Sequence, residues 1–142
     1  MTPHRQRGFT LIEIMVVVII IGLLAAIVAP NVIGRLGDAE ITKAKAEISN
    51  LENAINLFYM DNRRYPTTEQ GLDALATRPT DPNIRNWQEG GYMKRIPSDP
   101  WGNPYLYLSP GNNGIFDIYT LGADGQPGGE GINADIGNWD LE

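Results

Sequence analysis

The feature that most constrains this chain is an apolar segment close to its N-terminus. The residues from Phe9 to Pro30 are almost all apolar, and a helix of that length spans the roughly 30 Å hydrocarbon core of a bilayer. The alternative, a buried core helix, is disfavoured because the rest of the chain is too small to cover a helix that is apolar on every side. We therefore predict a transmembrane helix over residues 9–30. Gly22 and Pro30 interrupt it, so a kink at the membrane exit or a locally unwound stretch is expected.

A short basic leader precedes this segment and ends in Gly8. In an ordinary secretory signal the small residue of the cleavage site follows the apolar region, whereas here it comes before. Cleavage between Gly8 and Phe9 would therefore leave the apolar segment in the mature chain as an anchor. Arg5 and Arg7 lie ahead of the apolar run, so the positive-inside rule predicts a cytoplasmic leader and a remainder outside the inner membrane.

Glu13 is the one acid within the apolar segment. A carboxylate at the centre of a membrane helix costs about 2.5 to 3.5 kcal/mol, and less near its end. An acid in the first turn of a helix gains only about 0.3 to 1 kcal/mol from the helix dipole. Cleavage before Phe9 would create an amine with an unperturbed pKa of about 7.7 to 8.0, which is a cation at neutral pH. We therefore favour an ionic partner for Glu13 over a purely local role.

The composition argues against an enzyme and against a nucleic-acid-binding protein. The chain has 142 residues, no cysteine and a single histidine, His4, in the leader. A mature chain without His or Cys lacks the commonest general base and a thiol nucleophile, and it can form no disulfide. The net charge is −6, and removal of Arg5 and Arg7 leaves nine basic against seventeen acidic side chains, or −8. Such an acidic chain is a poor ligand for nucleic acid.

The remaining sequence predicts an α+β head. Apolar residues at spacings of three and four continue the first helix to about Asp61. Thr67 and Gln70 have the spacing of a capping box before a short helix. Residues 92–96, 105–108 and 115–120 have strand character and are separated by turn residues, which predicts a small antiparallel sheet packed on the helix.

The C-terminal region holds a loop rich in glycine and oxygen-bearing side chains, over residues 121–135. Calcium takes six to eight oxygen ligands in flexible geometry, and glycines allow a loop to turn its carbonyl oxygens inward. The spacing is not that of an EF-hand. Composition alone also fits a solvated acidic loop.

The N-terminal motif Gly8-Phe9-Thr10-Leu11-Ile12-Glu13 resembles the class III leader of type IV pilins and pseudopilins. This resemblance implies cleavage between Gly8 and Phe9 by a prepilin peptidase, followed by methylation of the Phe9 amine. It also implies that Glu13 pairs with the amine of an adjacent subunit.

From Phe9 to Trp139 the chain resembles the major pseudopilins of bacterial type II secretion, the protein G family of the general secretion pathway. The segments that carry the resemblance are Tyr65-Pro66-Thr67-Thr68-Glu69-Gln70-Gly71-Leu72, Asp99-Pro100-Trp101-Gly102-Asn103-Pro104-Tyr105, Leu121-Gly122-Ala123-Asp124-Gly125 and Asp135-Ile136-Gly137-Asn138-Trp139. In that family the C-terminal loop binds calcium. The resemblance assigns this ion to the side chains of Asp124 and Asp135 and the main-chain oxygens of Leu121 and Gln126, with Glu130 as a further candidate.

The resemblance implies a lollipop-shaped subunit in three parts: a cleaved leader (1–8), a transmembrane and filament-core helix (9–30), and a periplasmic head (31–142) that includes the upper half of the long helix. Copies would polymerise from the inner membrane into a periplasmic filament that drives folded proteins through the outer membrane. Expected partners are other copies, minor pseudopilins, the prepilin peptidase, and an inner-membrane platform with its ATPase.

Two alternatives remain open from the sequence. A type IV pilus subunit for adhesion or motility shares the leader and the helix, but usually has a cysteine pair that is absent here. A membrane-anchored periplasmic hydrolase is disfavoured by the lack of His and Cys in the mature chain and of a G-x-S-x-G motif.

Overall fold

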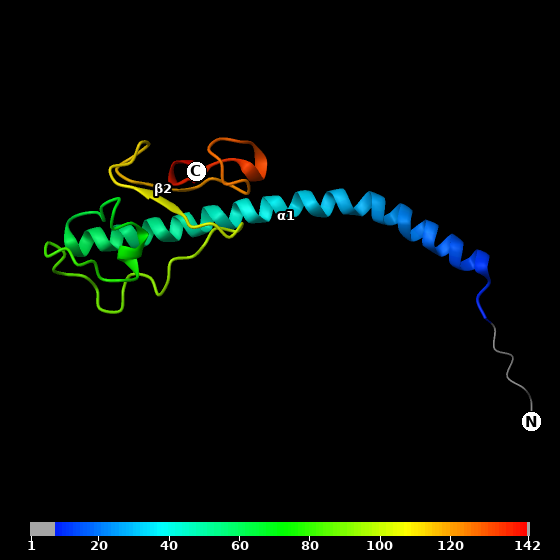
Figure 1. Ribbon diagram of the computed structural model, residues 1–142, viewed down its shortest axis with the longest axis horizontal. Helices are drawn as coiled ribbons and strands as arrows, with labels where there is room; N and C mark the ends of the chain where they lie inside the picture. Colours follow the sequence, from blue (N-terminus) through cyan, green and yellow to red (C-terminus); the bar gives the residue numbers. More distant parts are fainter. Residues whose placement is uncertain (1–7, 142) are drawn as a thin grey trace, which may run out of the picture. The chain divides into compact units, whose positions relative to one another are not determined.

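The computed structural model describes the backbone of residues 8–141 and the side chains of residues 8–28 and 34–141. Apart from Gly8, the predicted leader lies outside the described residues. The contacts divide the chain into two compact units, Met1–Leu36 and Gly37–Glu142. The elements in chain order are α1 (Leu11–Asn62), the 3-10 helix η1 (Leu72–Leu75), the strands β1 (Leu106–Leu108) and β2 (Asp117–Thr120), the 3-10 helix η2 (Gly131–Asn133), the strand β3 (Ile136–Gly137) and the 3-10 helix η3 (Asn138–Asp140) (Figure 1).

The long N-terminal helix is confirmed, because α1 runs without a break from Leu11 to Asn62. Its backbone stays helical from Gly22 through Pro30, so the locally unwound stretch considered above is absent from the described backbone here. The side chain of Pro30 lies outside the described residues. The helix ends at Asn62, because the φ of 57° at the next residue, Arg63, takes the chain out of the helical conformation.

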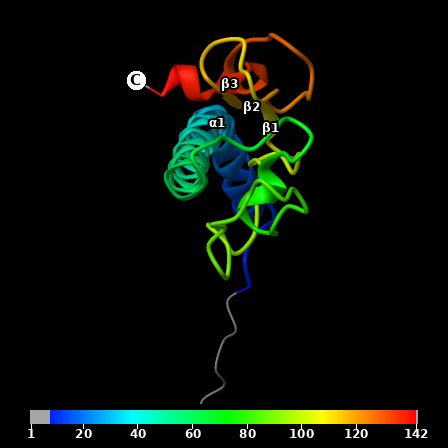
Figure 2. The same ribbon diagram turned by 90° about the vertical axis from the view of Figure 1, so that its left-hand side faces the viewer.

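In the second unit, the apolar stripe of α1 forms one wall of the core. Ala44, Ile48, Leu51, Ile55 and Phe58 recur at spacings of three and four and are all fully buried. Full burial of an Ile, Leu or Phe side chain contributes about 1.5 to 3 kcal/mol, so this stripe is a main source of the head's stability. The opposite wall comes from the sheet and from η1, and its buried members include Leu75, Tyr107, Ile118 and Ile136. Figure 2 shows the strands on one side of this part of α1.

The sheet is antiparallel, in the order β1-β2-β3. The predicted strands at 105–108 and 115–120 are confirmed with shorter bounds, and Tyr107 pairs with Ile118. Strand β3 was not predicted, and it pairs Ile136 with Thr120.

The predicted strand at residues 92–96 is wrong. Gly90 and Gly91 adopt positive φ angles of 91° and 83° and turn the chain immediately before this segment. The amides of Tyr92 and Met93 then both donate to the carbonyl oxygen of Leu75, at 2.8 and 3.1 Å. Successive residues of a strand point to opposite sides, so two neighbouring amides that share one acceptor exclude a ladder.

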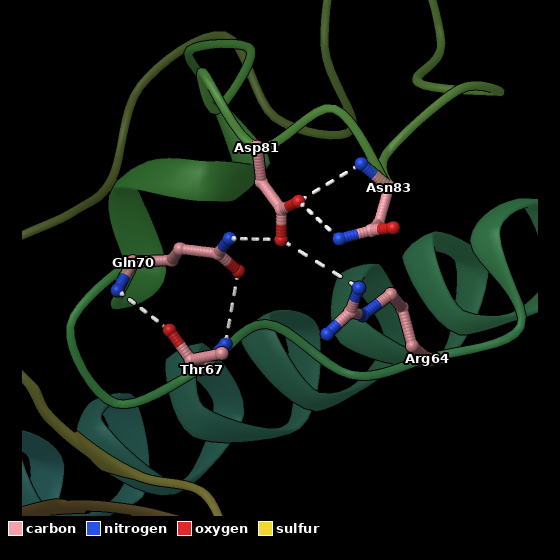
Figure 3. A network of polar contacts seen from close by, with 5 residues as sticks. All are labelled: Arg64, Thr67, Gln70, Asp81 and Asn83. Atoms are coloured by element: carbon pink, nitrogen blue, oxygen red, sulfur yellow. Dashed lines mark hydrogen bonds and ion pairs between the residues drawn. The ribbon is translucent and has the colours of Figure 1, made fainter.

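The capping box predicted at Thr67 and Gln70 is confirmed, although the helix that follows is a single 3-10 turn. The Thr67 amide donates to Gln70 Oε1 at 3.0 Å, and the Gln70 amide donates to Thr67 Oγ1 at 3.2 Å. Gln70 Nε2 also donates to Asp81 Oδ2 at 3.3 Å, while Arg64 lies 3.6 Å from the same oxygen (Figure 3). Hydrogen bonding from the Asn83 amide is the main cause that holds the pKa of Asp81 below its ordinary value. This network ties the loop after α1 back to the end of the helix.

Candidate functional site

The first candidate site is the N-terminal part of α1. From Leu11 to Val28 the helix has a mean hydropathy of 3.2 and no buried residue, and it is long and apolar enough to cross a membrane. The large apolar side chains of this span are 48% to 82% exposed, and Phe9 is 84% exposed. Contiguous apolar surface of this extent marks contact with lipid or with another protein.

Glu13 makes a local contact with Thr10 that was not among the predictions from the sequence. Its Oε2 accepts hydrogen bonds from the amide and Oγ1 of Thr10, at 2.8 and 3.0 Å. The Glu13 amide in turn donates to Thr10 Oγ1 at 3.3 Å. These reciprocal bonds form a capping box with Thr10 as the N-cap of α1. The Thr-x-x-Glu spacing ahead of an apolar run was visible in the sequence, so this role could have been predicted.

The second candidate site is the C-terminal loop between β2 and β3. The Ala123 amide donates to the Ile132 carbonyl at 2.8 Å, and the Asp135 amide donates to the Gly128 carbonyl at 3.2 Å. Glycine is required where the two arms meet, because a Cβ at Gly122 would lie 2.7 Å from the carbonyl carbon of Asn133. The sequence therefore folds this segment into a closed loop whose arms touch.

Asp124 and Asp135, the two predicted carboxylate ligands, lie on opposite arms of this loop. Asp124 is exposed, and its Oδ1 accepts from the Gln126 amide at 3.0 Å. Asp135 Oδ2 accepts from the Gly128 amide at 2.9 Å, whereas its Oδ1 is buried and has no hydrogen-bond partner among the described residues. An unsatisfied buried oxygen costs about 1 to 3 kcal/mol, and more when it is charged. A bound cation would remove that cost, so this oxygen fits the predicted ion.

The other predicted ligands differ in their exposure. Leu121 is half-buried, while Gln126 and Glu130 are exposed. Across the described residues, no three His, Cys, Asp or Glu side chains are grouped so that they could hold a metal ion. Glu130 therefore does not join Asp124 and Asp135 in a three-carboxylate cluster. Two carboxylates supplemented by main-chain oxygens would be a donor set for a hard cation.

A long helix with an uncovered apolar N-terminal part, and a small antiparallel sheet packed on its C-terminal part, define the class of pilin-like subunits. Within that class, the family model "Type II secretion system (T2SS), protein G" matches residues 31–139, and the model of the prokaryotic N-terminal methylation motif matches residues 3–29. The chain belongs to the type II secretion system protein G family.

Individual relatives agree with the family match. The type II secretion system core protein G of Vibrio cholerae is 58% identical over 139 residues, which cover 98% of this chain and 95% of that protein. The Pseudomonas aeruginosa protein of the same name is 54% identical over 141 residues, which cover 99% of each. The crystal structure of the major pseudopilin from the type 2 secretion system of enterohaemorrhagic Escherichia coli matches with a TM-score of 0.69 and 44% identity, over 79% of this chain and 96% of that chain. These relatives confirm the pseudopilin fold and favour a secretion component over a surface pilus subunit.

Proposed function

We propose that this chain is the major structural subunit of a type II secretion pseudopilus and has no enzymatic activity. The observation that carries the proposal is the helical span Leu11–Val28, which is fully apolar apart from Glu13 and has no buried residue, although the head beyond it has a complete core. Before assembly, the span of such a subunit would lie in the inner membrane and its head in the periplasm. In the filament, the span exchanges lipid contacts for contacts with the same span of other copies.

Assembly would begin with processing at the N-terminus. Prepilin peptidase would cleave between Gly8 and Phe9 and methylate the new Phe9 amine, in keeping with the methylation motif over residues 3–29. An inner-membrane platform and its ATPase would then add subunits at the base of a filament that also contains minor pseudopilins. Growth of this filament would drive folded proteins through the outer membrane.

Glu13 would have a second role after cleavage. In the uncleaved chain the Phe9 nitrogen is part of a peptide bond, and Glu13 caps its own helix through Thr10. Once Phe9 carries a free amine, the Glu13 carboxylate of a neighbouring copy would pair with it. In a low-dielectric filament core, this pairing would fix the register between copies more than it would add bulk attraction.

Two substitutions separate the capping role of Glu13 from its pairing role. Glu13→Gln keeps an acceptor for the capping box, since Gln serves in that motif as well as Glu, but it removes the charge. Thr10→Ala removes the cap and keeps the charge. We expect Glu13→Gln to abolish filaments seen by electron microscopy and Thr10→Ala to retain them. Wild-type filament yield from Glu13→Gln would show that the charge is not needed.

Deletion of the gene tests the function as a whole. Exported proteins should then accumulate in the periplasm, and the wild-type gene should restore their release into the medium. Loss of surface pili or twitching with normal protein release would instead indicate a type IV pilus subunit.

We also propose that the C-terminal loop binds calcium through Asp124 and Asp135 and the main-chain oxygens of Leu121 and Gln126, with Glu130 as a further candidate. Support comes from the unpartnered, buried Asp135 Oδ1 and from the oxygen-rich closed loop. An ion that binds only the folded loop stabilises the head by about 2.7 kcal/mol at a hundredfold excess over the dissociation constant. Such a gain would serve a small head that has no cysteine for a disulfide.

The calcium proposal is tested by calorimetry on the full mature chain in detergent micelles. The melting temperature should fall when a chelator removes calcium, and Asp135→Asn should melt near the chelated wild type whether or not calcium is added. Asp38→Asn is the matched control, because Asp38 is an exposed acid outside the loop. An unchanged melting temperature on chelation of the wild type would refute the site.

A further inference from the structure

A close contact joins the C-terminal loop to α1 at Gly37. A Cβ placed on Gly37 would lie 2.7 Å from Ile132 Cγ2, and among the described residues that methyl carbon is the one atom outside the local helix within 4 Å of such a Cβ. Carbon atoms in favourable contact are about 3.5 to 4.0 Å apart. The Ile132 side chain therefore fills the space that the missing Cβ leaves on the helix surface. Both residues belong to the second unit, Gly37–Glu142.

Ile132 is also part of the contact that closes the loop. Its carbonyl accepts from the Ala123 amide at 2.8 Å, and this bond joins the arm that contains Asp124 to the arm that leads to Asp135. Elsewhere this second arm stands away from the helix, since a hollow of about 440 Å³ lies between Ala134 and Asp135 on one side and Ile41 and Lys45 on the other. The contact of Ile132 with α1 therefore affects the position of both arms of the loop.

We propose that Gly37 and Ile132 are positioning residues for the calcium loop. The contact would hold η2 at a fixed distance from α1 and so keep the Asp135 arm in register with the Asp124 arm. The inference rests on the proposed calcium site, because it concerns how that site is preorganised. Residues that orient metal ligands without touching the ion typically change the affinity by about 10- to 100-fold when they are substituted.

The glycines of α1 provide a matched pair of substitutions. Glycine within a helix is less favourable than alanine, so helix propensity alone predicts that Gly34→Ala and Gly37→Ala are both stabilising. Among the described side chains and outside its own stretch of helix backbone, a Cβ at Gly34 would meet nothing within 4 Å. A Cβ at Gly37 would displace Ile132 Cγ2, and we expect η2 to move away from the helix with it.

The test measures the dissociation constant of calcium chloride by isothermal titration calorimetry, with the full mature chain in detergent micelles. Gly34→Ala should bind as the wild type does, whereas Gly37→Ala should bind about tenfold more weakly. Leucine at position 132 lacks the Cγ2 methyl that would clash with the new Cβ at position 37. The double variant Gly37→Ala with Ile132→Leu should therefore bind calcium within about twofold of Ile132→Leu alone, a difference of roughly 0.4 kcal/mol. Ile132→Ala removes the contact without a clash and should also weaken binding.

The outcomes separate this inference from the calcium proposal. If the wild type binds calcium and Gly37→Ala binds as tightly as Gly34→Ala, the positioning role is wrong and the site stands. The same conclusion follows if Gly37→Ala with Ile132→Leu binds about tenfold more weakly than Ile132→Leu alone. Circular dichroism in chelator shows whether Gly37→Ala folds. If it does not fold, Ile132→Ala is the deciding variant, and calcium binding by Ile132→Ala as tight as that of the wild type would refute the positioning role. If the wild type takes up no calcium, both proposals are wrong.

Discussion

The Tyr105 hydroxyl donates a hydrogen bond to Glu47 Oε2 over 2.6 Å and joins the residue before β1 to the middle of α1. Trp101 makes a parallel connection closer to the start of the head, where its Nε1 donates to Glu40 Oε2 at 3.0 Å. Burial is the main cause that raises the pKa of Tyr105 above its ordinary value, and the hydrogen bond to the Glu47 carboxylate adds to it. Two aromatic side chains from the sheet region thus anchor on acids that flank the buried stripe of the helix.

Tyr105→Phe should destabilise the head by about 1 to 3 kcal/mol, because it leaves a partly buried carboxylate without its donor. Lys43 compensates little, since its Nζ lies 3.8 Å from Glu47 Oε1 and its side chain is 60% exposed. Tyr119→Phe is the matched control, as the Tyr119 hydroxyl has no hydrogen bond to any described residue. Thermal unfolding of the full chain in micelles gives the melting temperatures of the Tyr105→Phe and Tyr119→Phe variants. Equal melting temperatures for the two variants would contradict a stabilising role for the Tyr105 contact.

Arg63→Gly should stabilise the protein. Arg63 is the one non-glycine residue of the described chain with a positive φ, 57°, and this conformation costs about 1 to 2 kcal/mol for a residue that has a Cβ. Glycine adopts it freely and is the residue that helices prefer just after their end. A gain of about 1 kcal/mol would raise the melting temperature by about 4 to 8 °C in a head of this size. Arg64→Gly is the control, and it should lower the melting temperature because Arg64 pairs with Asp81. A lower melting temperature for Arg63→Gly would show that its side chain makes a stabilising contact.

Alkaline pH should destabilise the head through Tyr107. Burial raises the pKa of its hydroxyl from 10.0 to about 12, and the hydroxyl donates to the Pro66 carbonyl at 3.0 Å. The folded state therefore favours the neutral phenol. Its contribution is fully present below pH 10 and is lost as the pH rises from about 10 to about 12. The melting temperature measured across this range should fall less steeply for Tyr107→Phe than for the wild type. Parallel curves would mean that Tyr107 does not titrate differently in the two states.

The sequence predicted the elements that depend on short-range pattern. The 52-residue helix was evident because its apolar run and its three-and-four spacing persist over many turns. The reciprocal capping at Thr67 and Gln70 was also predictable, because a capping box is defined within four residues. Strands β1 and β2 could be predicted because turn residues bound them on both sides.

The predictions from the sequence fail where the local structure depends on contacts with residues far away in the chain. Residues 92–96 have strand-like composition, but the Leu75 carbonyl captures two consecutive amides there. Strand β3 has only two residues and exists because Ile136 pairs with Thr120, which no local pattern reveals. For the candidate site, the loop and its carboxylates were predictable from composition. The contact of Ile132 with Gly37 was not, since it joins residues almost a hundred positions apart.

The most direct test is a cryo-electron microscopy reconstruction of filaments sheared from cells that express the full gene. The central claim is that other copies of the chain cover the exposed apolar span Leu11–Val28. We expect a lipid-free filament in which this span of each subunit packs against the same span of its neighbours, with the heads outside. Filaments in which the span is absent or faces solvent, with only the heads in contact, would contradict the claim.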